Sequence, residues 1–205
     1  NLKLIASSSP HIRSSEDTRS IMLDVIIAMI PALAMSIYVF GFQALVLTLV
    51  SVASCMFWEW AYRKLMKKSC AVGDLSAVVT GMLLAFVCPV SLPWWTIVIG
   101  AFFSIVVVKQ LYGGIGCNFL NPALAGRAFM FSWPVAMSTW VKVGFENAPD
   151  IFSGADIVTA ATPLANMHQG MMPAESWTQL FWGNIGGCIG ETSAVMLLIG
   201  LVYLL

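Results

Sequence analysis

The chain has 205 residues, of which 59% are apolar and only 10% are charged. Soluble domains average about 45–50% apolar and about 25% charged residues, so this composition excludes a disordered chain and an ordinary cytosolic enzyme. Ten basic and ten acidic residues cancel, so no net field attracts nucleic acid. Since a spanning helix needs roughly 20 apolar residues, the sequence predicts an integral membrane protein with about six spans.

The first part of the chain carries the longest apolar stretches. Continuous spans are predicted at about 20–40 and 44–62. The next stretch, 75–90, is shorter and contains Pro89 near its end. A proline there interrupts helical hydrogen bonding, so we expect a short or discontinuous helix at this point.

The later spans differ in strength. Three more stretches have the composition of spans, namely 94–108, 121–137 and 182–205. Trp94 and Trp95 open the first of these, where amphipathic rings favour the membrane interface. The second is weaker because it carries Arg127.

Charge predicts the topology and the domain limits. Basic residues gather in the segment 1–19 and in the loop 63–68, whereas 138–176 holds one lysine against four acids. Lysine and arginine stay on the cytoplasmic side, so we expect a cytoplasmic N-terminal segment 1–19 and an external loop 138–176. The membrane domain is then 20–137, covering a first repeat and the start of a second, and 177–205 is a span of the second repeat.

A short internal repeat supports this division. Gly-Asp-Leu-Ser-Ala-Val at 73–78 recurs as Gly-Glu-Thr-Ser-Ala-Val at 190–195. The predicted crossings place the two copies in opposite orientations, which is typical of inverted repeats whose discontinuous helices meet near the membrane midplane. The sequence therefore predicts an all-α polytopic membrane fold with inverted repeats and discontinuous helices.

Acidic residues border several apolar segments. Asp74 and Glu191, one in each copy of the repeat, are candidates for an ion path, because a charge at mid-depth costs about 2.5–3.5 kcal/mol or more. A carboxylate at a helix start also caps the helix, and we favour that interpretation for both. Glu59 lies four residues before Arg63, so we expect these two to form an interfacial salt bridge.

Two other segments contain residues suited to binding. Asn118 and Asn121 follow a glycine-rich stretch and would share a face of a helical turn. Their amides would bond either to broken-helix backbone or to the polar edge of a ligand such as a flavin ring, and the residues leave both open. The segment 156–163 places two threonines among small residues, which by itself favours an ordinary loop or helix start.

The five cysteines are scattered and lack a Cys-x-x-Cys pair. We therefore expect packing residues and no metal site in this chain, although any of them could join a metal site shared with another subunit. No catalytic residue is predicted.

Several motifs together resemble one family. They are Ser-Ser-Ser-Pro-His at 7–11, Gly-Asp-Leu-Ser-Ala-Val-Val-Thr-Gly at 73–81, Lys-Gln-Leu-Tyr-Gly-Gly at 109–114, Asn-Phe-Leu-Asn-Pro-Ala at 118–123, and Gly-Gly-Cys-Ile-Gly-Glu-Thr-Ser at 186–193. In this order they resemble the D subunits of the Rnf complex. The related B subunit of the sodium-pumping NADH:quinone oxidoreductase fits less well at 7–11.

The resemblance implies a covalent flavin. Family members carry FMN joined through its phosphate to the last threonine of a motif, which here is Thr162. Asp156, Thr159, Ala160 and Ala161 form the rest of that motif, with Ala160 where glycine is commonest. A separate flavin transferase would make the bond from FAD.

The resemblance also implies a second flavin and a wider assembly. Riboflavin would bind near Asn118 and Asn121, within a fold similar to urea transporters. The expected function is a multi-pass flavoprotein subunit of a bacterial inner-membrane ferredoxin:NAD⁺ oxidoreductase coupled to Na⁺ or H⁺ translocation. Its partners would be other subunits, the flavin transferase and the lipid bilayer, with ferredoxin and NAD reached indirectly and no nucleic acid bound.

Two alternatives stay open. One is the B subunit of the quinone-reducing relative, and the other is a urea-transporter-like solute channel without a redox role. Family members continue for several more spans, so we expect this chain to be part of a longer protein.

Overall fold

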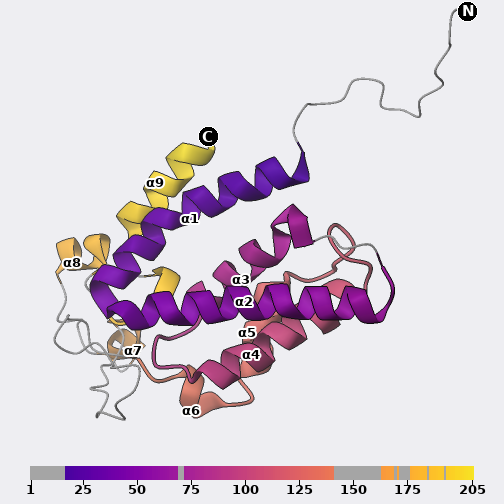
Figure 1. Cartoon of the computed structure of the whole chain (residues 1–205). Coiled ribbons are helices and arrows are strands. Elements are labelled where there is room, and N and C mark those ends of the chain that lie inside the picture. Colours follow the sequence, from indigo (N-terminus) through magenta and orange to yellow (C-terminus); the bar gives the residue numbers. More distant parts are fainter. Residues whose placement is uncertain are drawn as a thin grey trace, which may run out of the picture.

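A computed structural model of the chain contains helices and no strands over the residues that it describes. These residues are 17–68, 72–140, 163–168, 170, 176–183, 185–191 and 193–205. Two long antiparallel helices, α1 (Thr18–Phe40) and α2 (Phe42–Leu65), form a hairpin (Figure 1). They coincide closely with the spans predicted at 20–40 and 44–62.

A single glycine turns the chain between these two helices. Gly41 has φ 76° and ψ −167°, a conformation that side chains with a Cβ rarely adopt. The tight turn places the N-terminal end of α1 and the C-terminal end of α2 at the same end of the bundle (Figure 1). Among the described residues, only α1 and α2 are long and apolar enough to cross a membrane by themselves.

The next helices are shorter. α3 (Ser76–Phe86) follows a 3₁₀ turn, η1 (Val72–Asp74), which confirms the short helix predicted at 75–90. α4 (Trp94–Phe102) continues directly into a π-helical segment, η2 (Phe103–Gln110). These two together occupy the stretch predicted as a span at 94–108.

The span predicted at 121–137 is wrong as one continuous helix. It divides into α5 (Pro122–Met130) and α6 (Pro134–Met137). Pro134 explains the break, because proline disfavours helical backbone in the residue before it, and Trp133 has φ −113° and ψ 71°. A nine-residue helix rises only about 14 Å, roughly half the thickness of the hydrocarbon core.

The stretch predicted as a span at 182–205 also divides. After α7 (Pro163–His168), the chain forms α8 (Trp177–Trp182), the 3₁₀ turn η4 (Ile189–Glu191) and α9 (Ala194–Leu204). Gly183 ends α8 in the left-handed conformation with φ 92°, the usual way in which glycine terminates a helix. The total of about six spans remains a prediction.

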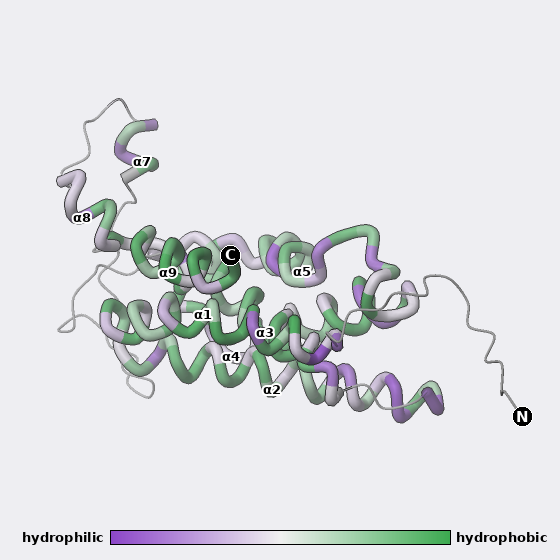
Figure 2. The backbone as a smooth tube through the Cα atoms, turned by 90° about the horizontal axis from the view of Figure 1, so that it is seen from above, coloured by the Kyte–Doolittle hydropathy of each residue, from purple (hydrophilic) through white to green (hydrophobic). Residues whose placement is uncertain are grey.

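The two copies of the internal repeat have the same local structure. In each copy a 3₁₀ turn ends at the acidic residue, Asp74 or Glu191, and an 11-residue helix follows. α3 packs along α2, and α9 packs along α1 (Figures 1 and 2). The repeat therefore produces two short helices, each supported by one arm of the long hairpin.

Glycine allows both short helices to approach their supports. A Cβ on Gly81 in α3 would lie 2.7 Å from Val52 Cα in α2, and a Cβ on Gly200 in α9 would overlap the carbonyl oxygen of Ala28 in α1. Ser51 Oγ donates to the Gly81 carbonyl at 2.7 Å. The absence of a side chain is thus what sets the spacing of both helix pairs.

Substitution of Gly81 tests this spacing. We expect Gly81→Ala to lower the free energy of unfolding by about 1–3 kcal/mol, because the added methyl group must push two backbones apart. Thermal unfolding of the purified protein in detergent measures the effect. Gly73→Ala is the matched control, since a Cβ there meets no atom within 4 Å. Equal stability of the two variants would contradict the proposed contact.

Candidate functional site

A buried ion pair lies inside the helix bundle. Lys109 in η2 and Glu59 in α2 are almost completely buried. Lys109 Nζ lies 3.0 Å from Oε1 and 3.2 Å from Oε2 of Glu59, and Gln110 Nε2 donates to Oε1 at 2.6 Å. Both carboxylate oxygens therefore have donors, which offsets much of the cost of removing the charge from water.

The same lysine connects this pair to the first copy of the repeat. Lys109 Nζ donates to Ser76 Oγ at 2.6 Å, and Ser76 Oγ donates to Asp74 Oδ1 at 2.7 Å. The backbone N–H of Ser76 also donates to Asp74 Oδ1, at 3.0 Å. Asp74 lies one residue before Leu75, the N-cap residue of α3, and accepts from the first N–H of that helix. It ends a continuous polar chain that begins at Glu59.

The salt bridge expected between Glu59 and Arg63 is present, with Arg63 Nε 3.9 Å from Glu59 Oε1. The Glu59 side chain is fully buried, and Lys109 is its closer partner. Sequence reasoning missed this contact because Lys109 and Glu59 lie 50 positions apart and no local pattern links them.

The two asparagines expected to share a helical face do not do so. Asn121 caps α5, with its Oδ1 accepting from the N–H groups of Ala123 at 3.0 Å and Leu124 at 3.4 Å. Asn118 precedes this helix, and its buried Oδ1 has no hydrogen-bond partner. One amide is therefore used by the backbone, while the other retains an acceptor.

A second polar cluster lies around Arg127 in α5. Arg127 Nη1 is 4.0 Å from Glu191 Oε1, and Nη2 is 3.8 Å from Cys188 Sγ. Arg127 Nε is buried without a hydrogen-bond partner. Ser193 Oγ, rather than Glu191, accepts from the first turn of α9, at the Met196 N–H. Glu191 therefore differs from Asp74, since it pairs with an arginine.

This cluster lies where the two copies of the repeat meet. The backbone N–H of Ile189 in η4 donates to the Cys88 carbonyl at 3.0 Å, just beyond the end of α3. Cys188 Sγ contacts the Val87 carbonyl at 3.4 Å. A Cβ on Gly190 would overlap the Phe86 side chain, so the contact between η4 and α3 depends on that glycine. The discontinuous elements of both copies therefore lie side by side.

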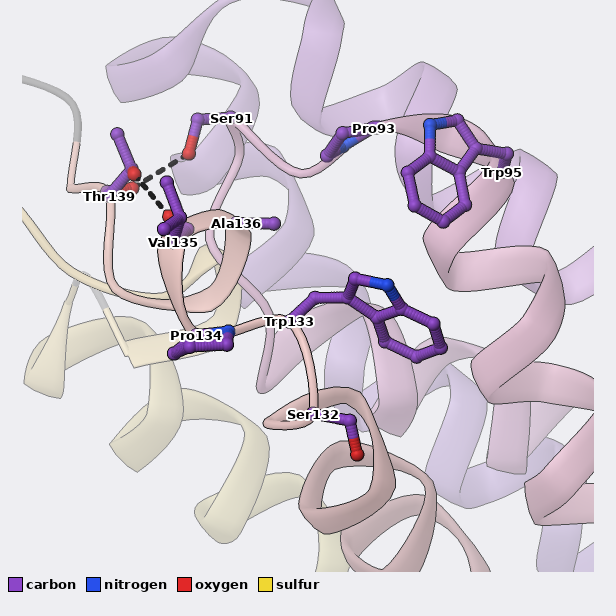
Figure 3. A pocket seen from close by; sticks show the side chains of 9 residues that line it. All are labelled: Ser91, Pro93, Trp95, Ser132, Trp133, Pro134, Val135, Ala136 and Thr139. Atoms are coloured by element: carbon purple, nitrogen blue, oxygen red, sulfur yellow. Dashed lines mark hydrogen bonds between the residues drawn. The ribbon is translucent and has the colours of Figure 1, made fainter.

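The structure has two cavities, one beside Arg127 and one between the α4 and α6 regions. One, of about 330 Å³, is lined by Arg127, Glu191, Leu164 and Leu180 among others. The second, of about 490 Å³, is lined mainly by apolar groups. Figure 3 shows the indole rings of Trp95 and Trp133 beside it, 6.0 Å apart and almost perpendicular.

The attachment motif itself, Asp156, Thr159, Ala160, Ala161 and Thr162, lies outside the described residues. The next helices along the chain, α7 and α8, lie at the opposite end of the bundle from the C-terminal end of α2 (Figure 1). Figure 2 shows hydrophilic residues gathered at that end of α2. The bundle thus has a basic end at the C-terminal end of α2 and, opposite it, an end where α7 and α8 lie (Figure 1).

Three of the four described cysteines are buried. Cys55, Cys88 and Cys188 are buried, Cys117 is exposed, and all four are free thiols. Among the described residues, no group of three metal-ligating side chains comes together. Cys70 lies outside the described part of the chain.

The long apolar hairpin, the short helices beside it and the buried charges are typical of a helical membrane protein with discontinuous helices. The chain belongs to the NQR2, RnfD, RnfE family, whose model matches residues 5–205.

Curated relatives make the same assignment. Over its whole length the chain is 50% identical to the D subunit of the Na⁺-translocating ferredoxin:NAD⁺ oxidoreductase complex of Acetobacterium woodii, and the match covers 63% of that protein. Over 97% of its length it is 36% identical to the D subunit of the proton-translocating ferredoxin:NAD⁺ oxidoreductase complex of Clostridium ljungdahlii, and this match covers 61% of that protein. The expected likeness to Rnf D subunits is confirmed, and the chain spans about three fifths of the length of these relatives.

Removal of the buried charge of Lys109 should destabilise the fold. We expect Lys109→Met to lower the free energy of unfolding by about 3–5 kcal/mol, because Glu59 would remain buried without its closest cation. Thermal unfolding in detergent measures this. The exposed Lys64 provides the control Lys64→Met, and the double variant Glu59→Gln/Lys109→Met should lose less stability than the two single changes added together. An unchanged free energy of unfolding in Lys109→Met would contradict a stabilising ion pair.

Proposed function

We propose that the chain is part of a membrane flavoprotein subunit that carries electrons in a ferredoxin:NAD⁺ oxidoreductase coupled to Na⁺ or H⁺ translocation. The observation that carries this proposal is the match over the whole chain to D subunits whose names state that activity. The complete attachment motif ending at Thr162 supports the flavin.

The proposed attachment is a phosphoester on Thr162. The Thr162 hydroxyl would attack the phosphorus of the FMN half of FAD, so that the Oγ–P bond forms while the pyrophosphate P–O bond breaks and AMP leaves. A flavin transferase would provide the base that takes the hydroxyl proton. Ala160 and Ala161 leave room around the ester because their side chains are small. The bound FMN supplies reversible electron transfer, and the chain holds it at a fixed position.

The flavin is proposed to lie on the outer face of the bacterial inner membrane. Basic residues at the C-terminal end of α2 support a cytoplasmic location for that end. α7, which begins directly after Thr162, lies at the opposite end of the bundle (Figure 1), and this supports a flavin on the side opposite the basic loop.

Riboflavin near Asn118 and Asn121 is a second, separate proposal. The unpartnered Oδ1 of Asn118 supports it, because a buried amide oxygen without a donor is costly and the N–H of a flavin ring would satisfy it. Asn121 would contribute indirectly, by holding the start of α5.

The two alternative functions have less support. A quinone-reducing B subunit would belong to the same family, but the relatives described above are named for ferredoxin and NAD⁺. A solute channel without a flavin would leave the attachment motif unexplained.

The proposed fold is urea-transporter-like with inverted repeats. The matching local structures of the two copies of the repeat support it.

The covalent flavin can be seen directly. We expect the purified subunit, produced with its flavin transferase, to give a fluorescent band under ultraviolet light after denaturing electrophoresis. Thr162→Ala should abolish the band because no hydroxyl remains, whereas Ser153→Ala, in the same loop, should retain it. A wild-type band that survives in Thr162→Ala would place the flavin elsewhere, and no band at all would refute a covalent flavin.

The ion-path candidates can be separated from caps. Asp74→Asn keeps an oxygen that can accept from Ser76 while removing the charge, and Glu191→Gln likewise removes a charge. We expect both variants to impair ion transport driven by ferredoxin oxidation in membrane vesicles more than they reduce the content of covalent flavin. Normal transport in both variants would show that these acids have only local structural roles.

A further inference from the structure

Arg127 holds an unusual position for an arginine. A guanidinium has five N–H donors and no acceptor. Here its contacts to polar groups of the described residues are long: 4.0 Å to Glu191 Oε1 and 3.8 Å to the thiol of Cys188. Its Nε is buried and has no hydrogen-bond partner. The structure therefore supplies a cation with unused donors.

The cavity beside Arg127 suits a flat aromatic group. Its volume of about 330 Å³ lies within the range of small-ligand sites. Most of the side chains that line it are apolar, namely Trp140, Leu164, Leu180 and Ile185. Such a lining favours a ring over a phosphate, which needs polar groups on several sides. The pair Arg127 and Glu191 provides the charged part of the wall.

One residue that lines the cavity, Leu164, lies close in sequence to Thr162. Leu164 is in α7 and follows Thr162 by two residues, a separation of at most about 7 Å along the chain. An FMN esterified to Thr162 therefore has its ribityl chain and ring within reach of this cavity.

We propose that the isoalloxazine ring of this FMN occupies the cavity and that Arg127 faces it and raises its reduction potential. This inference rests on the proposed attachment at Thr162. Two electrons and one proton convert the neutral oxidised ring into a reduced ring with one negative charge. A guanidinium with free donors stabilises that charge, whereas Glu191 opposes it.

The test is an anaerobic redox titration of the intact complex, with dithionite as the electron donor and flavin absorbance as the signal. The difference from the Thr162→Ala complex isolates this flavin. We expect Arg127→Gln to make its potential more negative by at least about 30 mV, a tenfold loss in the equilibrium constant for two-electron reduction. Arg127→Lys should recover part of the shift, and Glu191→Gln should shift the potential in the opposite direction.

Two controls make the outcomes distinct. Lys64→Gln removes the same charge at the far end of α2 and should leave the potential unchanged. The fluorescent band reports attachment separately, so its absence from the wild-type subunit would refute the proposed function, and this inference with it. If the Arg127→Gln complex carries flavin and keeps the wild-type potential, the proposed role of Arg127 is overturned. If Arg127→Gln does not assemble, the Glu191→Gln complex serves as the test. A wild-type potential in that complex would overturn the proposal that the flavin ring lies beside these two charges.

Discussion

A charged lysine inside an apolar helix bundle needs a carboxylate at contact distance, and Glu59 provides it for Lys109. The pair connects α2 with η2, and Ser76 extends the connection to the start of α3. Lys109 lies 50 positions from Glu59 and 33 from Ser76, so these contacts join η2 to two helices that precede it in the chain. Since either charge alone would be buried without its partner, the arrangement of the first repeat depends on this interaction.

The second copy of the repeat is held against the first by contacts to backbone carbonyl groups. The carbonyl groups of Val87 and Cys88, beyond the end of α3, contact Cys188 and Ile189. This contact satisfies polar groups that a broken helix would otherwise expose to lipid. It also places Glu191 beside Arg127 and the smaller cavity. Arg127 and Leu164 thus line the same cavity, and Leu164 follows Thr162 by two residues.

The sequence predicted the long hairpin, the short α3 and the similarity of the two repeat copies, because hydropathy, Pro89 and the repeated motif are local signals. It did not predict the helix breaks at Pro134 and Gly183, since the apolar composition of these stretches resembles a continuous span. The partner of Glu59 was missed because a pair four residues apart is visible in sequence, whereas Lys109 meets Glu59 only through folding. The free donors of Arg127 had no sequence signal.

The central proposal is that this chain carries a covalent flavin on Thr162. The most direct test is mass spectrometry of the peptide that contains Thr162, taken from the intact and active complex. The account predicts that this peptide carries the mass of FMN less one water, with fragmentation placing the addition on Thr162. An unmodified peptide from an active complex would contradict it.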